Sequence, residues 1–213
     1  MDRITLGDAL TFWMVPHPAW TPNREWPKDV GFVTWASADT FVFIDPLVRD
    51  DLDPRAWEQF DDAASAAQRV AVLLTAPWHE RSVRAVSGRY DAPVWIHQRG
   101  RARIADLPEL STVPNGVRVF QAGGVDEGQV AFHIVPERTL VVAEFFLGTN
   151  RGLRVAPSPT LNLDAFTASL DELRDLPIDR VLVAHGPPVL SDGSIAIRDA
   201  LDTFSNEASP SRE

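Results

Sequence analysis

Two runs of β-branched and aromatic residues stand out in the first quarter of this 213-residue chain. Residues 31–37 (GFVTWAS) and 40–48 (TFVFIDPLV) are separated by a polar turn at Ala38–Asp39, and they predict two neighbouring strands. The second run is apolar at consecutive positions, which is typical of a strand covered on both faces. It ends at Asp45–Pro46, because proline cannot continue a central strand.

A strand–helix–strand pattern follows. Residues 69–75 predict a buried strand, residues 80–90 a helix and residues 92–97 a short strand. The tight connections make this a βαβ unit, which predicts a parallel strand pair.

The second half of the chain also combines predicted strands and helices, and it contains more hairpins. Strands are expected at residues 116–123, 129–136, 139–148 and 180–186, with a tight turn at Glu137–Arg138. Further helices are expected at residues 54–67, 163–176 and 194–208, with a short one near Ala105–Leu110. Strands followed by βα units in each half predict an α/β fold, a four-layer αββα sandwich of two mixed β-sheets flanked by helices. We expect a single domain over residues 1–205 and a disordered tail at 206–213.

The first 30 residues differ from the rest in composition. They hold three of the seven tryptophans, Trp13, Trp20 and Trp26, and four prolines, so a long helix is excluded. We expect a short strand followed by an irregular aromatic loop. This loop either covers the core, with tryptophan as packing mass, or forms the aromatic wall of a ligand pocket.

Charge and composition limit the range of functions. A net charge of -10 disfavours binding to nucleic acid, because the phosphate backbone is also negative. The absence of cysteine excludes disulfides and thiolate metal sites. No apolar run approaches the roughly 20 residues that span a bilayer, and the first ten residues lack the pattern of a secretory signal. We therefore expect a soluble, cytoplasmic protein with no membrane or nucleic-acid partner, whose oligomeric state the sequence leaves open.

Residues 69–97, RVAVLLTAPWHERSVRAVSGRYDAPVWIH, carry a resemblance to a known family. They resemble the segment of metallo-β-lactamase-fold hydrolases in which a strand ends in Thr-His-x-His-x-Asp-His. Four more stretches, VFIDPLV, GGVDEGQVAF, TLVVAEFFLG and VLVAHGPP, resemble other signatures of that family in the same order. Together they span roughly residues 30–190, so the chain resembles a divergent member of the metallo-β-lactamase superfamily.

The resemblance implies where metal ligands would lie in this chain. Three motif histidines fall on Ala76, Trp78 and Arg81, and the motif aspartate falls on Glu80. The next ligand histidine falls on Val125.

Two positions of the implied ligand set keep a residue of similar chemistry. The aspartate that bridges the metals falls on Glu144, and the last histidine is retained as His185. The other five of the seven positions hold changed or non-ligating residues. Since a hydrolytic zinc site needs at least three good donors, we expect no tightly bound zinc and no other cofactor.

The substitutions suggest a compensating arrangement. Without a dication, Glu80 and Glu144 would be buried like charges. We expect Arg81 to occupy part of the metal space and to pair with Glu144, with Trp78 filling the rest. In the alternative, Glu80 and Arg81 open the helix as a solvated pair.

Three functions fit these residues. The first is a degenerate, non-hydrolytic homologue that binds a small molecule. The second is a hydrolase-like enzyme with a rebuilt acid/base or single-metal site, acting on an ester, lactone or thioester. The third is a partner-binding protein whose cleft is filled, so the sequence leaves open whether the chain is an enzyme.

Candidate residues follow from these functions. His97 and His133 are interpreted as structural, and His79 stands at a non-ligand position of the motif, with its ring either outside the site or turned inward as a ligand or base. The catalytic candidates are His185, Glu144 and His79. The candidates for a ligand pocket are Trp78, Glu80, Arg81, Asp45 and Val125.

Overall fold

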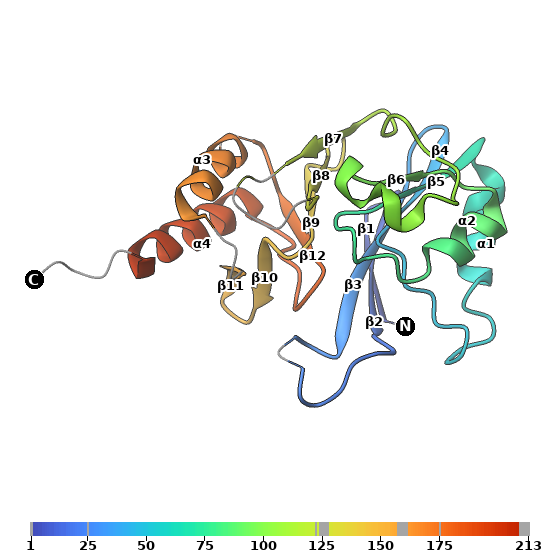
Figure 1. The fold of residues 1–213 in the computed structure, drawn as a ribbon, viewed down its shortest axis with the longest axis horizontal. Coiled ribbons are helices and arrows are strands. Elements are labelled where there is room, and N and C mark those ends of the chain that lie inside the picture. Colours follow the sequence, from blue (N-terminus) through green and yellow to red (C-terminus); the bar gives the residue numbers. More distant parts are fainter. Residues whose placement is uncertain are drawn as a thin grey trace, which may run out of the picture.

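Two mixed β-sheets pack face to face, and helices cover the outer side of each (Figure 1). The computed structural model describes residues 2–24, 26–121, 123, 128–156, 162–174 and 176–208. Within them, α1 and α2 lie outside one sheet, and α3 and α4 lie outside the other. The four-layer αββα sandwich predicted from the sequence is confirmed.

The first sheet has six strands in the order β1-β2-β3-β4-β5-β6. Its strands β1 to β4 are antiparallel, and β4, β5 and β6 are parallel, as the βαβ pattern predicts. All five residues of β4 are buried, since both faces of the strand are covered. The strands are β1 (Asp2–Leu6), β2 (Leu10–Pro16), β3 (Asp29–Ala36), β4 (Thr40–Ile44), β5 (Arg69–Leu73) and β6 (Val94–Trp95).

The second sheet has four strands in the order β12-β9-β8-β7. Its strands β7, β8 and β9 are antiparallel, and β12 pairs with β9 in parallel. A separate hairpin, β10–β11, lies below this sheet in Figure 1. These strands are β7 (Val117–Phe120), β8 (Ala131–Ile134), β9 (Thr139–Val142), β10 (Phe146–Thr149), β11 (Gly152–Val155) and β12 (Arg180–Val183).

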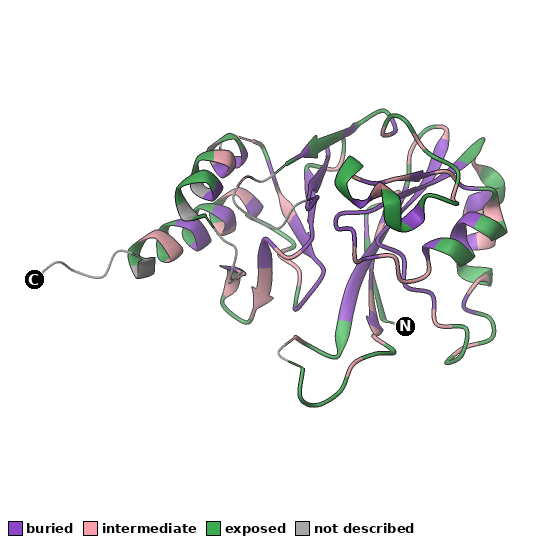
Figure 2. Cartoon of the chain, in the orientation of Figure 1, coloured by how far each residue is buried: buried purple, intermediate pink, exposed green. Residues whose placement is uncertain are grey.

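Three apolar clusters fill the spaces between the four layers. One lies between the two sheets and includes Phe12, Val33, Phe132 and Leu182. The other two lie between each sheet and its helices, so the helices show a buried face inward and an exposed face outward (Figure 2). The helices are α1 (Glu58–Ala66), α2 (Val83–Tyr90), the 3-10 helix η1 (Gln98–Ile104), α3 (Leu163–Arg174) and α4 (Gly193–Ala208). No helix in the described part of the chain is long and apolar enough to span a membrane.

The structure corrects the prediction for the N-terminal segment. One short strand was expected, and the chain instead forms the β1–β2 hairpin, which turns at Gly7 with φ of 76°. The prolines begin only at Pro16, so residues 10–15 are free to pair on both sides. The irregular aromatic loop is therefore limited to the segment between β2 and β3.

A second correction concerns the stretch TLVVAEFFLG. It was predicted as one strand, but it forms β9 and β10 with a turn around Glu144 between them. Phe145 and Phe146 are both buried in the same apolar cluster. Because successive residues of a strand point to opposite faces, two adjacent buried phenylalanines on one side require such a break.

One smaller prediction was also wrong. The helix expected near Ala105–Leu110 is replaced by η1 (Gln98–Ile104), since the backbone beyond it extends to pair with β6: Val94 N–H donates to Pro108 O at 2.8 Å. Of the tail predicted at 206–213, residues up to Ala208 belong to α4, and residues 209–213 lie outside the described part.

The two sheets meet closely where β3 passes β12. Gly31 N–H donates to Ala184 O at 2.8 Å, and Val30 forms an antiparallel bridge with His185. A Cβ atom on Gly31 would lie 2.3 Å from Val183 O, so glycine is the residue that permits this approach.

Replacing Gly31 with alanine should lower the free energy of unfolding by about 1–3 kcal/mol, because the added methyl group overlaps backbone atoms. Gly88→Ala is the matched control. A Cβ atom there meets nothing within 4 Å in helix α2, so it should raise stability by about 0.5–1 kcal/mol. Chemical denaturation of both variants measures the difference, and equal effects would refute the close approach.

His133 provides a test of pH-dependent stability. It is 2% exposed, and neither ring nitrogen has a hydrogen-bond partner among the described residues. Burial, and then the charge of Arg118, lowers the pKa of His133 below its usual value near 6.5. The unfolded chain therefore takes up the proton first, and stability is lost as the pH falls below about 6.5.

His133→Leu should remove this loss. The variant should be more stable than the parent protein at pH 8, and its advantage should grow between pH 7 and pH 5. Urea denaturation of both proteins across this range measures the difference in unfolding free energy. A constant difference at all pH values would show that His133 does not titrate in this way.

Candidate functional site

Four strand ends converge at the junction between the two sheets. Asp45 directly follows β4, and Thr75 lies two residues beyond β5; Glu144 and His185 lie two residues beyond β9 and β12. Strands β4 and β5 are parallel, as are β9 and β12, so each pair ends at the same edge of its sheet. The carboxyl ends of parallel strands are the usual location of ligand sites in α/β proteins.

The first half of the site is a buried carboxylate–imidazole pair. His79 Nδ1 lies 2.9 Å from Asp45 Oδ2. Thr75 N–H donates to Asp45 Oδ1 at 2.8 Å, and the hydroxyl of Thr75 donates to Oδ2. The side chains of His79 and Asp45 are only 3% and 4% exposed. Because the carboxylate of Asp45 can only accept a hydrogen bond, Nδ1 of His79 carries the proton that is donated to it. Nε2 lies on the other side of the ring.

The second half of the site is Glu144 with two imidazoles directed at one of its oxygens. His185 Nε2 lies 3.3 Å from Glu144 Oε1, and His79 Nε2 lies 3.8 Å from the same oxygen. The side chain of Glu144 is 35% exposed, while that of His185 is 9% exposed. Asp45, His79, Glu144 and His185 thus form one continuous series of contacts, named here the carboxylate–imidazole network.

Electrostatics favour the charged forms of His79, Asp45 and Glu144. Burial alone would lower the pKa of His79, but the charge and hydrogen bond of Asp45 outweigh it and the pKa is raised. Burial likewise acts to raise the pKa of Asp45 and of Glu144. The facing imidazoles outweigh it in both cases, and both carboxyl pKa values lie below their usual range.

Arg81 does not form the expected ion pair with Glu144. Its Nη1 donates to the backbone carbonyls of Gly31 and Asp45, at 2.9 and 3.1 Å, and no ion pair to a carboxylate is formed within the described residues. Burial lowers the pKa of Arg81, and the charges of Asp45 and Glu144 act in the opposite direction. The guanidinium therefore neutralises this region through space while its hydrogen bonds go to strand ends.

Backbone strain coincides with the site. Asp45 and Arg81 have φ angles of 52° and 25°, in the region that favours glycine. Such conformations cost on the order of 1–3 kcal/mol and concentrate at functional sites.

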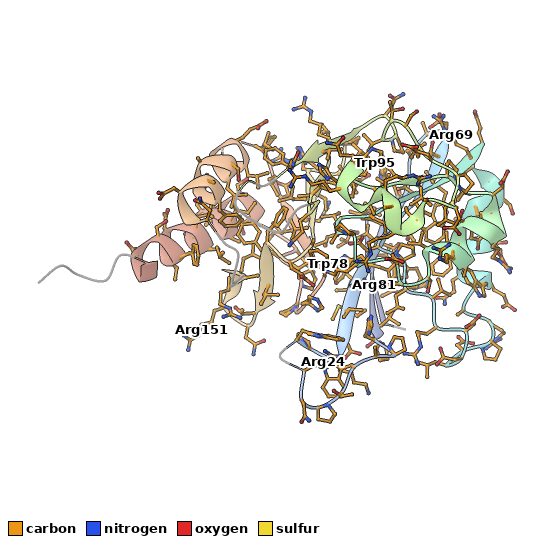
Figure 3. All side chains as sticks on the ribbon, viewed as in Figure 1. Arg24, Arg69, Trp78, Arg81, Trp95 and Arg151 are labelled. Atoms are coloured by element: carbon orange, nitrogen blue, oxygen red, sulfur yellow. The ribbon has the colours of Figure 1, made fainter. Side chains whose placement is uncertain are left out.

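Of the predicted pocket residues that follow β5, the structure places Trp78 and Arg81 next to the network and Glu80 away from it. Figure 3 shows Trp78 and Arg81 at the centre of the molecule, where the two halves meet. Trp78 is partly buried, and its ring centroid lies 6.3 Å from that of His79. Glu80, in contrast, pairs with Arg103 and has no contact with the network, so the alternative Glu80–Arg81 pair is not formed either. Val125 lies outside the described residues.

The aromatic loop between β2 and β3 reaches the network. The ring centroid of Trp26 lies 5.4 Å from that of His185, and His17 packs edge-on against Trp26 at 5.1 Å. Trp20 Nε1–H donates to the carbonyl of Trp26 at 2.9 Å, which fixes the loop. Burial and the nearby charge of Arg81 lower the pKa of His17. Of the two uses proposed for this loop, lid or aromatic wall, contact with His185 fits both.

The interior beneath the network is well filled. A cavity lined by Asp45, Gly31 and Ala184 has a volume of only about 10 Å³. A larger hollow of about 860 Å³ lies elsewhere, between the β10–β11 hairpin and α4. A ligand at the network must therefore bind at its outer side, where Glu144 is exposed.

The residues at the network do not fit a dinuclear zinc centre. Ala76 and Trp78 supply no donor, Glu80 is turned towards Arg103, and the partly buried cation Arg81 stands beside the donors that are left. Asp45 is buried and already bound by Thr75 and His79. Within the described residues, no group of three or more His, Asp or Glu side chains has an arrangement that would hold a metal ion.

Comparison with known proteins identifies the fold. No family model matches the sequence, and no curated protein matches it either. Solved structures do match: the DIM-1 metallo-beta-lactamase superposes with a TM-score of 0.70 and 9% identity over 98% of both chains. VMB-1 gives 0.67 and 11% over 98% of both chains. A metallo-beta-lactamase family protein from Thermus thermophilus gives 0.63 and 18%, over 94% of this chain and 81% of its own.

These likenesses establish that the chain has the metallo-β-lactamase fold. At such low identities they establish the fold and nothing about activity.

His79 is the residue whose role the sequence described least well. The family resemblance placed it between ligand positions, with its orientation open. The sequence did contain a signal for this role. Asp45 and Thr75 follow the ends of two adjacent parallel strands, and a histidine four residues after Thr75 can fold back onto them. The structure shows that the ring is turned inward.

Removing His79 should strongly destabilise the protein. His79→Leu leaves Asp45 buried without its charged partner, and we expect a loss of about 3–5 kcal/mol. Glu80→Gln is the control, since the Glu80–Arg103 pair is partly solvated and should cost about 0–1 kcal/mol. If chemical denaturation gave similar losses for the two variants, the network would not be the stabilising element described above.

Proposed function

We propose that this chain is a metal-independent protein of the metallo-β-lactamase fold that binds a small organic molecule beside Glu144 and His185 and does not hydrolyse it. The observation that carries the proposal is the carboxylate–imidazole network itself. It lies where the resemblance implies metal ligands, and its charges are compensated by other side chains of this protein. The lack of tight zinc binding and a cytoplasmic location belong to the same proposal.

Internal compensation favours binding over catalysis. An efficient general base has a pKa near the working pH, and the facing imidazoles hold the pKa of Glu144 below its usual range. Asp45 and His79 are almost fully buried and bound to each other, and Glu144 faces His185. What the network offers to solvent is the partly exposed carboxylate of Glu144, and each histidine that faces it packs against a tryptophan, an arrangement suited to recognition.

Metal content is the direct test of this proposal. Protein purified without chelator, and the same protein dialysed against excess zinc, should both contain far less than one equivalent by elemental analysis. The combined variant Ala76→His, Trp78→His, Arg81→His should gain zinc, because it restores imidazoles at three positions of the implied ligand set and removes the cation. One or more equivalents retained by the parent protein would overturn the proposal.

One observation favours a second function. Glu144 and His185 lie 3.3 Å apart with the carboxylate partly exposed, which is the geometry of an orienting acid and a general base. In that case the protein would be an acid/base hydrolase acting on an ester, lactone or thioester. Turnover of such substrates that is lost in both Glu144→Gln and His185→Gln, and kept in Glu80→Gln, would select this function instead.

A further inference from the structure

The charge available to a ligand at the network is that of Glu144. Both imidazole contacts go to Oε1, and within the described residues no side chain donates to Oε2. Asp45, the other carboxylate, is closed off by Thr75 and His79. Glu144 is therefore an anion with one oxygen still free to accept from a ligand.

The positive groups of the site are turned inward. His79 is 3% exposed, and its Nδ1 is bound to Asp45. Arg81 is anchored through Nη1 to two backbone carbonyls of the strand ends. These cations thus stabilise the network from behind, while the carboxylate of Glu144 faces outward.

Aromatic surface lies next to this carboxylate. Trp26 covers the ring of His185, whose Nε2 contacts Glu144, and His17 packs edge-on against Trp26. On the other side, Trp78 adjoins His79, whose Nε2 points at the same glutamate oxygen. Each histidine that faces Glu144 thus packs against a partly buried tryptophan.

Within the described residues, two buried ring nitrogens of the network lack a hydrogen-bond partner, as do both ring nitrogens of His133 outside it. His79 Nε2 and His185 Nδ1 have no hydrogen-bond partner in the described part of the chain, although the two residues are 3% and 7% exposed. Native proteins satisfy most buried polar atoms, so an unpartnered one beside a partly exposed carboxylate is compatible with a bound ligand or water.

The following inference rests on the proposed binding function. The geometry points to a small organic cation, an alkylammonium or quaternary ammonium group, as the ligand. A carboxylate pairs with the positive charge, and the faces of tryptophan attract a cation through their π electrons. A neutral ligand could donate a hydrogen bond to Glu144 but would gain no charge attraction, and an anion would be repelled. The net charge of -10 on the chain adds a long-range attraction of the same sign.

Three molecules of the same shape and different charge test the inference. Choline, its neutral analogue 3,3-dimethylbutan-1-ol and the anion 3,3-dimethylbutanoate are titrated into the full-length protein by calorimetry. Choline should bind about tenfold or more tightly than the neutral analogue. Glu144→Gln should remove most of this preference, and Trp26→Leu should weaken choline binding about two- to fivefold.

Two control variants locate the binding. Glu80→Gln removes a carboxylate of similar exposure that pairs with Arg103, and it should leave choline affinity unchanged. Ala196→Phe narrows the separate hollow between β10–β11 and α4, and it should also have no effect. Choline binding that survives Glu144→Gln and is lost in Ala196→Phe would place the ligand in that hollow and overturn the inference.

The other outcomes separate this inference from the proposed function. Equal binding of all three analogues, or preference for the anion, would overturn the cation inference and leave a small-molecule site in place. No binding of any analogue would also overturn it, and the proposed function would then rest on its own zinc and turnover measurements.

Discussion

The close approach of β3 to β12 is the constraint on which the rest of the site depends. Gly31 allows the two backbones to come within hydrogen-bond distance, and this joins the edges at which the parallel strands of both sheets end. Residues far apart in sequence, Asp45 from one sheet and His185 from the other, become members of one network. Asp45, Glu144 and His185 each lie within two residues of a strand end, so the sheets determine where these residues meet.

Charge balance is the second organising factor. A cation buried beside two carboxylates reduces their repulsion, whether a metal or a side chain supplies it. Here the imidazole of His79 lies between Asp45 and Glu144, and the guanidinium of Arg81 stands beside both. Positive groups that are part of the chain are present as soon as the protein folds. The network thereby couples the stability of the fold to the integrity of the site.

Much of the fold could be predicted because hydrophobic periodicity reports it directly. The fully buried strand β4 and the βαβ unit are visible as apolar runs and helical spacing, and the order of five signatures identified the fold class. The break between β9 and β10 was missed because an unbroken apolar run such as TLVVAEFFLG does not reveal a turn inside it. It becomes clear only when Phe145 and Phe146 are seen in one cluster.

The candidate site was predicted less completely, for a physical reason. Sequence alignment to a motif gives positions, but the direction of a side chain depends on backbone angles that the motif does not specify. Arg81, with φ of 25°, turns towards the carbonyls of Gly31 and Asp45 and away from a carboxylate partner. Glu80 finds Arg103, which lies on a different segment. Such choices between competing partners are decided by three-dimensional proximity.

The turn between β9 and β10 has a broader consequence. Glu144 belongs to neither strand, so its identity is not constrained by strand pairing or by packing between the layers. A substitution at this position changes the chemistry presented at the junction while the sheets keep their register. New ligand chemistry can therefore arise at this turn without a change in sheet register, and its cost to folding is set by the contacts that Glu144 makes with His79 and His185.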